Sequence, residues 1–472
     1  MKMKKADKQP NIVFILSDDQ GVWAMGCAGN REVRTPNLDR LAARGVRFDN
    51  FFCTSPVCSP ARASLFTGRI PSQHGVHDWI REGSVGPDAI EYLAGQTAYT
   101  EVLADHGYVC GLSGKWHLGD SVKPQKGFTH WFVHQTGGSP YYNAPMIRDG
   151  KLYNEPAYVT DVITDDALQF IDDRVGAEDE RPFYLSVHYS APHSPWLNGN
   201  HPQSYLDQYA DCPGESCPLD TPRHPWLIKT APGEDNPLDN LRGYYASITA
   251  MDANIGRILD KLETHGLTDD TLIIFMSDNG FNFGHHGVFG KGNGTFPQNM
   301  YDTSIKVPAL FSHTGRIPQN VVSEAMVSGY DFMPTLLDYV GLPNPAADSL
   351  PGHSFLPQLL GEVADERDNV VIYDEYGPVR MIRSKVWKYV HRYPYGPHEL
   401  YDLVRDPQES VNLNDAPECR SQREAMKSQL EQWFVQYVDP AVDGVREPVS
   451  GYGQLAEAGV RGKGKQAYHD QE

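Results

Sequence analysis

The chain has 472 residues, of which 40% are hydrophobic and 22% are charged, and its formal net charge is −20. A chain of this length can bury a core large enough to fold without disulfides or a structural metal. Its acidic charge is spread along the sequence, which argues against nucleic acid or an anionic membrane as a partner, because both would be repelled. Any anionic substrate must therefore be bound by a local group of positive side chains.

Cysteine content and hydropathy bear on the compartment. The seven cysteines are an odd number, and only Cys212 and Cys217 are spaced to close a small loop, so reduced thiols are the simpler interpretation. No segment approaches the roughly 20 apolar residues of a membrane span. The apolar run 12–16 is too short for the core of a signal peptide. We therefore expect a cytoplasmic protein as the sequence stands, or a periplasmic or secreted one if a leader has been removed.

The first 280 residues or so alternate between predicted strands and helices. Apolar, β-branched runs of the kind found in buried parallel strands occur at residues 12–16, 108–112, 183–187 and 271–276. Helices are expected from Pro36, near Glu101, and along an apolar stripe from Tyr244 to Leu262. This alternation predicts an α/β fold, in which a large, mostly parallel sheet is covered by helices on both faces.

The pattern changes near residue 370. Short predicted strands separated by turns indicate a small antiparallel sheet, with strands at 371–376, 379–382 and 387–391. An amphipathic helix is expected over 422–435. We place the domain boundary at residue 360, so that residues 1–360 form the large α/β domain. Residues 361–472 then form a smaller α+β unit, whose last stretch, from about residue 443, is polar and Gly-rich and could be a tail or an arm.

Two of the predicted parallel strands end alike. Asp18 and Asp19 follow the first strand, and Asp278 and Asn279 follow the strand at 271–276. Ligands of open α/β sheets bind at the carboxyl ends of the strands, and oxygen-only ligation favours Ca²⁺ or Mg²⁺ over zinc. Turn formation or helix capping would explain one such pair, but two matched strand ends favour a metal site.

Cys58 is the candidate nucleophile. Pro60 favours the start of a helix, so Cys58 is expected at a helix N-terminus, where the dipole lowers the pKa of a thiol. Arg62 follows one turn later. These residues alone indicate an activated cysteine beside an arginine. A thiolate phosphatase is one interpretation, although its phosphate loop is usually longer and it needs no metal.

The segment Cys58-x-Pro60-x-Arg62, followed by Thr67-Gly68, resembles the signature of the type I sulfatases, which belong to the alkaline-phosphatase-like superfamily. Further blocks resemble that family in the same order, at residues 17–21, 35–39, 114–119, 191–195, 277–280 and 399–403. In this family a formylglycine-generating enzyme oxidises the cysteine to formylglycine, and the hydrated aldehyde attacks sulfur. The resemblance covers nearly the whole chain and implies that residues 1–360 are the catalytic domain.

The resemblance implies a role for each site residue. The implied metal ligands are Asp18, Asp19, Asp278, Asn279 and an oxygen of the modified Cys58, around Ca²⁺ or Mg²⁺. The implied sulfate-binding residues are Arg62, Lys115 and Lys291, although a longer insert than usual follows Lys291. His193 would protonate the leaving alcohol, and His117 would take the proton of the second aldehyde-hydrate hydroxyl as sulfate is expelled. Lys115 and His117 are two residues apart, so an extended segment would direct both to one face.

The motifs do not specify the substrate. We expect a sulfated carbohydrate, because no apolar membrane-entry segment accompanies the site, and His74, His77 and Asp78 are candidates to contact sugar hydroxyls. One alternative is a phosphonate monoester or phosphodiester hydrolase on the same scaffold. Another is a non-catalytic, metal-stabilised binding protein in which Cys58 remains a thiol. A monomer and a homo-oligomer both remain open.

Overall fold

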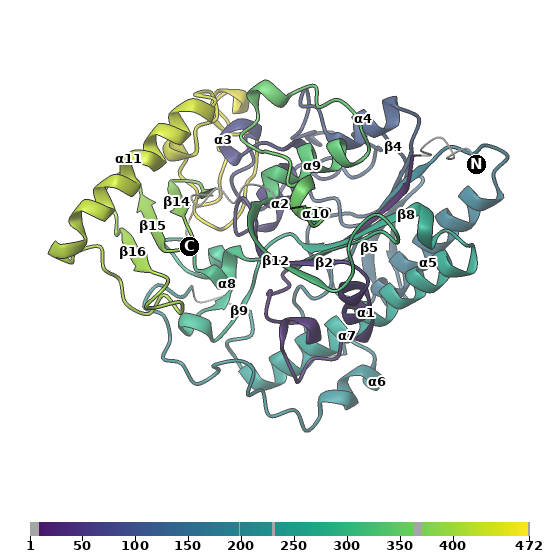
Figure 1. Cartoon of the computed structure of the whole chain (residues 1–472), viewed down its shortest axis with the longest axis horizontal. Coiled ribbons are helices and arrows are strands. Elements are labelled where there is room, and N and C mark those ends of the chain that lie inside the picture. The colour runs from purple at the N-terminus through teal and green to yellow at the C-terminus, as the bar shows by residue number, and fades with distance from the viewer. Residues whose placement is uncertain (1–8, 198, 229–231, 363–370, 471–472) are drawn as a thin grey trace.

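A ten-stranded sheet forms the centre of the computed structural model, which describes residues 9–197, 199–228, 232–362 and 371–470 (Figure 1). The strand order is β12-β2-β11-β8-β1-β7-β3-β4-β5-β6. The bounds are β1 (Asn11–Ser17), β2 (Val46–Phe52), β3 (Val109–Gly114), β4 (Phe128–His134), β5 (Ala144–Arg148), β6 (Lys151–Glu155), β7 (Phe183–His188), β8 (Thr271–Ser277), β11 (Ala309–Ser312) and β12 (Val321–Ser328). The central strands β8, β1, β7, β3 and β4 are parallel, while β11, β5 and β6 run antiparallel to their neighbours. The predicted α/β class with a mostly parallel sheet is confirmed.

Helices cover both faces of this sheet. Their bounds are α1 (Pro36–Ala43), α2 (Cys58–Thr67), α3 (Pro71–His74), α4 (Tyr99–Asp105), α5 (Val159–Gly176), α6 (Gln203–Leu206), α7 (Pro237–Thr264), α8 (Asp302–Ile305), α9 (Phe332–Tyr339) and α10 (Leu356–Leu359). Ile12, Phe14 and Leu16 of β1 belong to the core that includes α2, α4 and α9, while Val13 and Ile15 face the core under α1, α5 and α7. Figure 1 shows these two helical layers on opposite sides of the sheet. Because β1 has apolar neighbours on both faces, its continuous apolar run is explained.

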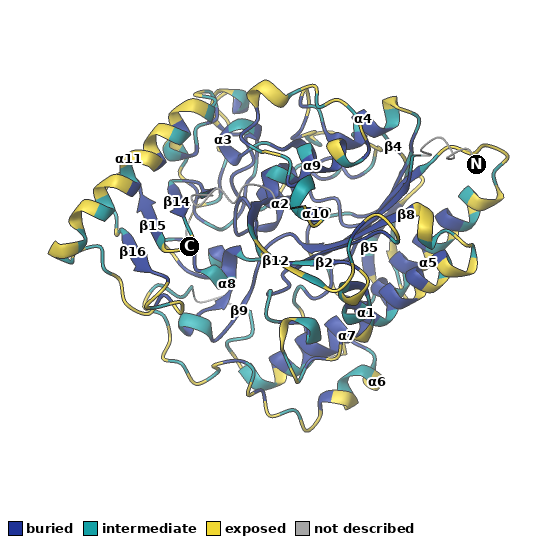
Figure 2. Cartoon of the chain, viewed as in Figure 1, coloured by how far each residue is buried: buried dark blue, intermediate teal, exposed yellow. Residues whose placement is uncertain are grey.

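A second, four-stranded antiparallel sheet lies beside the large one, next to helix α11 (Arg420–Tyr437). Its strands are β13 (Ile372–Tyr376), β14 (Val379–Arg383), β15 (Trp387–Arg392) and β16 (Glu399–Asp402). Met426, Leu430 and Phe434 of α11 pack on the apolar face of this sheet, while the outer face of α11 is exposed (Figure 2). The predicted domain boundary at residue 360 lies just after α10 and stays a prediction. Residue 370, near which the sequence pattern changes, lies outside the described residues.

Of the two alternatives for the last stretch, a tail or an arm, the structure shows an arm over residues 443–470. Val449, Ala458 and Tyr468 are buried in the main core, together with Val442 just before this segment. We call residues 443–470 the C-terminal arm. Its apolar side chains are spaced irregularly among glycines. The arm packs against the main core because burial there removes these side chains from water. In Figure 1 the yellow C-terminal segment runs beside α3.

The structure also describes the two cysteines that could have closed a loop, and the apolar character of the helices. Cys212 and Cys217 are both free thiols, so the small loop is not closed. The Cys212 sulfur instead lies 3.5 Å from a carboxylate oxygen of Glu32, and the Cys217 sulfur lies 3.8 Å from the Tyr245 hydroxyl. Among the described helices, none combines the length and the apolar character required to cross a membrane.

Candidate active site

The register of β1 and β8 builds a carboxylate cluster. Ser17 and Ser277 are paired in register, so the residues that follow each strand lie side by side. The backbone N–H of Asp19 donates to Asp278 Oδ1 (3.3 Å), and the Asn279 amide donates to Asp19 Oδ1 (2.8 Å). Oxygens of Asp18, Asp19 and Asp278 lie within 4.8 Å of one another, and all three residues are buried. The predicted convergence of the two strand ends is present.

The oxygen donors of this cluster fit a hard divalent cation. Asp18 Oδ1 and Asn279 Oδ1 are buried and accept no hydrogen bond from any described residue. A buried oxygen without a partner costs about 1–3 kcal/mol, so unpaired atoms in a compact oxygen cluster indicate a missing ligand rather than a structural motif. Carboxylate and amide oxygens without nitrogen or sulfur are the donor set of Ca²⁺ and Mg²⁺.

Electrostatics keeps part of the cluster ionised. Burial alone would raise the pKa of Asp18, but Lys115 and His193 lower it below its usual value. The pKa of Asp19 is also lowered, because Lys291 and His193 outweigh burial. Burial and the neighbouring Asp18 carboxylate raise the pKa of Asp278. The cluster is therefore an anionic site stabilised by adjacent cations.

Cys58 is the first residue of α2, as predicted, and it is 3% exposed. From the same helix, Arg62 reaches the cluster, with Nε 2.8 Å from Asp278 Oδ2 and Nη1 2.9 Å from the carbonyl oxygen of Lys115. The expected lowering of the thiol pKa is wrong. Burial raises the pKa of Cys58, and it outweighs the opposing effect of Lys115 and Lys291. An unmodified Cys58 is therefore a neutral thiol.

Two lysines complete a positive group around the cluster. Lys115, directly after β3, forms an ion pair with Asp18, and both side chains are fully buried. Lys291 follows the short strand β10 (Phe289–Gly290), which pairs with β9 (Asn282–Phe283), and its Nζ lies 2.5 Å from Asp19 Oδ1. The long insert after Lys291 therefore does not carry it away from the site. Together with Arg62, the lysines form the local positive group that an acidic protein requires for an anionic substrate.

His193 lies at the edge of the cluster, in the loop after β7. Its Nε2 is 3.7 Å from Asp19 Oδ2, and its Nδ1 is 2.7 Å from the carbonyl oxygen of Ser194. The side chain is 26% exposed, in contrast to the buried carboxylates beside it. A Tyr141 hydroxyl that donates to the His193 carbonyl (2.8 Å) helps to fix the loop. His193 is therefore placed between the buried cluster and solvent.

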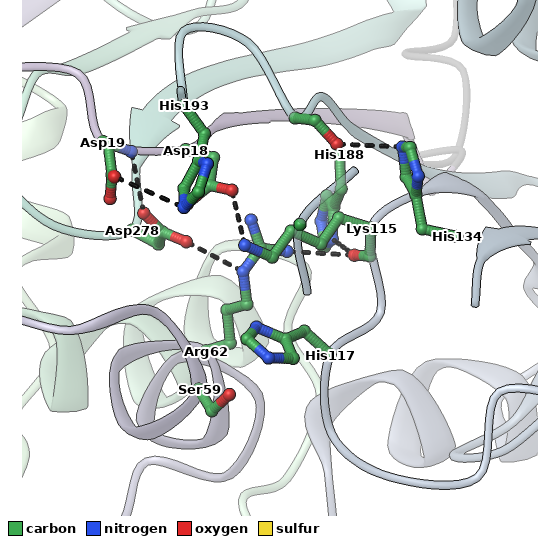
Figure 3. A network of polar contacts seen from close by, with 12 residues as sticks. Asp18, Asp19, Ser59, Arg62, Lys115, His117, His134, His188, His193 and Asp278 are labelled. Carbon is green, nitrogen blue, oxygen red and sulfur yellow. Dashed lines mark hydrogen bonds and ion pairs between the residues drawn. The ribbon is translucent and has the colours of Figure 1, made fainter. Parts of the chain in front are cut away.

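His117 is buried on another side of the site, close to Arg62 and Ser59 (Figure 3). Its backbone φ is 57°, so the segment after Lys115 is not extended there, contrary to expectation. His117 Nε2 lies 2.9 Å from the carbonyl oxygen of Ile80, while Nδ1 has no partner among the described residues. Because a carbonyl only accepts, Nε2 carries the proton of the neutral ring and Nδ1 is the free base. Burial and Lys115 lower the pKa of His117 well below its usual value, which keeps the ring neutral.

The sequence analysis did not identify some residues that hold the site together. Tyr244 lies in the apolar stripe of α7, yet its hydroxyl donates to the Asp19 carbonyl (2.8 Å) and accepts from the Gly21 N–H (2.9 Å). His188 Nδ1 lies 3.2 Å from the Lys115 carbonyl, and the ring packs between Phe14 and Phe66. A tyrosine within a buried stripe was the available signal, since its hydroxyl needs a partner.

The histidines and the aspartate expected to contact sugar hydroxyls are occupied by the protein itself. His77 Nε2 lies 2.8 Å from the carbonyl oxygen of Val442, and the His74 ring bonds Ser64. The Asp78 carboxylate accepts hydrogen bonds from the Tyr376 hydroxyl and from the backbone N–H groups of residues 79, 451 and 453. All three side chains are buried and bonded within the protein, Asp78 to the C-terminal arm, so they are not available to a sugar.

Comparison with known proteins gives consistent matches. The sulfatase family model matches residues 10–342, and a model described as the C-terminal part of N-sulphoglucosamine sulphohydrolase matches residues 284–436. The chain is 28% identical to N-acetylglucosamine-6-O-sulfatase of Bacteroides thetaiotaomicron, over 92% of this chain and 88% of that protein. It is 31% identical to the ulvan-active sulfatase of Formosa agariphila, over 91% and 83%. A solved structure of a protein in complex with its substrate D-glucosamine-2-N,6-O-disulfate aligns with a TM-score of 0.76 at 26% identity, over 92% of this chain and 99% of that one.

Proposed function

Because the chain belongs to the sulfatase family and is a sulfuric ester hydrolase, we propose that it removes sulfate from a carbohydrate, with residue 58 as the nucleophile after its thiol is oxidised to formylglycine. The observation that carries the proposal is the position of Cys58 at the N-terminus of α2, where the charges of Asp18 and Asp278 act on its thiol and where Arg62 of the same helix reaches Asp278. A neutral, buried thiol would be a weak nucleophile there, which favours the modified residue.

Asp18, Asp19, Asp278 and Asn279 would hold a divalent cation, and we favour Ca²⁺ over Mg²⁺ because it accepts a larger, less regular set of oxygens. When bound, the cation would neutralise charge on the sulfate and polarise the oxygen of residue 58. Arg62, Lys115 and Lys291 would bind the remaining sulfate oxygens and stabilise the charge that develops during transfer. The positions of these three positively charged side chains are set before substrate binds, because each is bonded to a carboxylate of the cluster.

The two histidines would transfer protons on different sides of the reacting sulfur. His193 is partly exposed and next to Asp19, so it suits the delivery of a proton to the departing alcohol of a large substrate. His117 is buried and neutral with Nδ1 free, so it suits the removal of a proton from the hydroxyl of residue 58 that regenerates the aldehyde. Their unequal exposure separates the leaving group from the nucleophile.

The carbohydrate substrate is supported by the relatives rather than by the site. Two similar proteins are named for N-acetylglucosamine-6-O-sulfate and for ulvan, and a similar solved structure contains D-glucosamine-2-N,6-O-disulfate. The partial exposure of His193 agrees with a leaving group that extends into solvent. We propose that the substrate is a sulfated mono- or oligosaccharide. We also propose that a formylglycine-generating enzyme converts Cys58 to formylglycine before the protein becomes active.

The test is production with and without a formylglycine-generating enzyme, followed by peptide mass and a panel of sulfated sugars with free sulfate as the readout. We expect the peptide that contains residue 58 to acquire the mass of formylglycine, and turnover to require that change and Ca²⁺. Turnover of a sulfate ester and a phosphonate ester of the same alcohol distinguishes sulfatase activity from phosphonate hydrolase activity. A large preference for the phosphonate ester contradicts the proposal. An unmodified thiol after co-production, with no turnover, would favour the binding protein instead.

A further inference from the structure

The main chain of Ile80 joins two parts of the candidate active site. Its carbonyl oxygen accepts the hydrogen bond of His117 Nε2 (2.9 Å), and its N–H donates to the Ser59 hydroxyl (3.0 Å). Ser59 directly follows Cys58 in α2, and Figure 3 shows Ser59 and His117 near Arg62. The position of one peptide segment therefore fixes the His117 ring relative to the N-terminus of α2.

The C-terminal arm holds this segment through Gln454. Residue 454 pairs with Ile80 as an isolated parallel bridge, in which Gln454 N donates to the Trp79 carbonyl (2.7 Å) and Arg81 N donates to the Gln454 carbonyl (2.8 Å). The side-chain oxygen accepts from His77 N (2.9 Å), and the side-chain nitrogen donates to the carbonyl oxygens of Gly75 and Ala456 (3.0 Å each). Gln454 is fully buried, so each of these bonds is shielded from water.

The arm is also tied to the loop that carries Lys291. The Gly451 carbonyl accepts from Trp79 Nε1 and from Asn293 Nδ2, each at 3.1 Å, and Asn293 is two residues beyond Lys291. Residues 453 and 455 pair with residues 469 and 467 of the same arm, which makes the support double-stranded. The arm is therefore a clamp between the Ile80 segment and the Lys291 loop.

We propose that Gln454 is a positioning residue for His117. By fixing the Ile80 carbonyl, it keeps His117 in the Nε2–H tautomer and leaves Nδ1 free to accept a proton. Among the described residues, the charged groups that act most strongly on the His117 ring are Lys115, Arg62 and Lys291, and none of them accepts a hydrogen bond, so the tautomer depends on the carbonyl. This inference rests on the proton-accepting role proposed above for His117.

The experiment compares Gln454→Ala and Gln454→Glu with Gln466→Ala, the same residue type exposed in the same arm. Gln454→Glu keeps the acceptor for His77 N but loses both amide donors. We expect kcat on the sulfate ester to fall roughly tenfold to a hundredfold in both Gln454 variants, with a smaller change in KM, since misplacing a proton acceptor affects the transition state. The acidic limb of the kcat–pH profile should move to higher pH, because a loosened His117 is better hydrated. Gln466→Ala should match the wild type.

A spectroscopic readout keeps the test independent of turnover. In protein labelled with ¹⁵N-histidine, with His117→Gln used for assignment, the wild type should show the Nε2–H tautomer for His117. Gln454→Glu should show tautomer mixing or protonation at neutral pH. A wild-type tautomer in both Gln454 variants, with activity lost only in proportion to thermal stability, overturns the inference and leaves the proposed function intact. If the wild type releases no sulfate while Gln454→Glu shows the expected change of the His117 tautomer, only the proposed function is contradicted.

Discussion

The molecule contains two clusters of buried charge that differ in how completely their polar atoms are bonded. In the candidate active site, Asp18 Oδ1, Asn279 Oδ1 and Arg62 Nη2 have no hydrogen-bond partner within the described ranges. These atoms point to a site that is complete only with a ligand. The cluster lies at the carboxyl ends of parallel strands, where α/β proteins bind their ligands.

The second cluster, which we call the Lys388 cluster, consists of Asp302, Arg383, Lys388 and Glu409. Asp302 accepts from Arg383 Nη2 (2.7 Å) and Lys388 Nζ (3.0 Å), while Glu409 accepts from Lys388 and from the backbone N–H of Asp302 (2.7 Å). All of its charged atoms are paired, and it joins α8 to the small sheet. Asp374, beside this cluster, is also buried, and neither of its carboxylate oxygens has a partner among the described residues. The comparison therefore teaches that the candidate active site is marked by unpaired oxygens gathered in one compact group at two strand ends, and not by buried charge or by a single unpaired carboxylate.

The largest expected effect is the loss of activity in Cys58→Ala. Removal of the proposed nucleophile should lower kcat/KM at least about 10⁴-fold, while the free energy of unfolding changes by no more than about 1 kcal/mol. Steady-state sulfate release and urea denaturation measure the two quantities. Cys110→Ala is the matched control, since Cys110 is an equally buried thiol in β3, and it should keep its activity. Equal losses of activity in both variants would contradict the role of residue 58.

Lys388→Met tests the other side of the comparison. Removing Lys388 leaves Asp302 and Glu409 buried beside each other, which should lower the free energy of unfolding by about 3–5 kcal/mol. The folded fraction should keep the wild-type kcat/KM. The exposed Lys385, in the turn before β15, offers a control, because Lys385→Met should change neither stability nor activity. If Lys388→Met is stable but inactive, the distinction between the clusters is wrong.

Addition of a divalent cation should distinguish the carboxylate cluster of the candidate active site from the Lys388 cluster. At a Ca²⁺ concentration of about 100 times Kd, binding to the folded state alone stabilises it by about 2.7 kcal/mol, so Tm should rise and a chelator should reverse the rise. Asn279→Ala removes one unpaired oxygen and should reduce the shift, whereas Lys388→Met should retain it. A Tm that is insensitive to both Ca²⁺ and Mg²⁺ would argue against a metal at the carboxylate cluster.

The sequence was sufficient for those parts of the site that local pattern determines. Asp18 and Asp278 each follow an apolar strand, and parallel register then brings them together. Cys58 begins its helix because Pro60 favours that start. The thiol pKa was predicted wrongly, since the helix dipole is a local feature but the burial of α2 depends on the whole fold.

Contacts between distant, non-periodic segments could not be predicted. Asp78 is bonded by Tyr376 and by Gly451, which lie far along the chain in regions with no apolar repeat. The local sequence does not distinguish an aspartate that is buried in a loop from one that binds a sugar. The C-terminal arm reads as polar because only a few of its side chains, such as Val449 and Tyr468, are buried, and their spacing follows neither strand nor helix.

The smallest predicted effect concerns Asp78, a buried carboxylate whose partners are all neutral donors. Burial raises its pKa from 3.8 to about 6, so between these pH values the folded state holds a proton that the unfolded state has released. Wild-type stability should therefore fall by up to about 3 kcal/mol across this window as pH rises, and stay level above it with respect to this group. Asp78→Asn cannot titrate, so its free energy of unfolding relative to wild type should increase from pH 4 to 6, even though an amide nitrogen in place of Oδ2 leaves the N–H groups of both Gly451 and Gly453 unpaired. Urea denaturation across that range measures the difference, with the exposed Asp470→Asn as the control. If the difference in the free energy of unfolding between Asp78→Asn and wild type is constant over this range, Asp78 is ionised throughout. Neutral donors would then stabilise a buried charge as well as the positive side chains of the Lys388 cluster do.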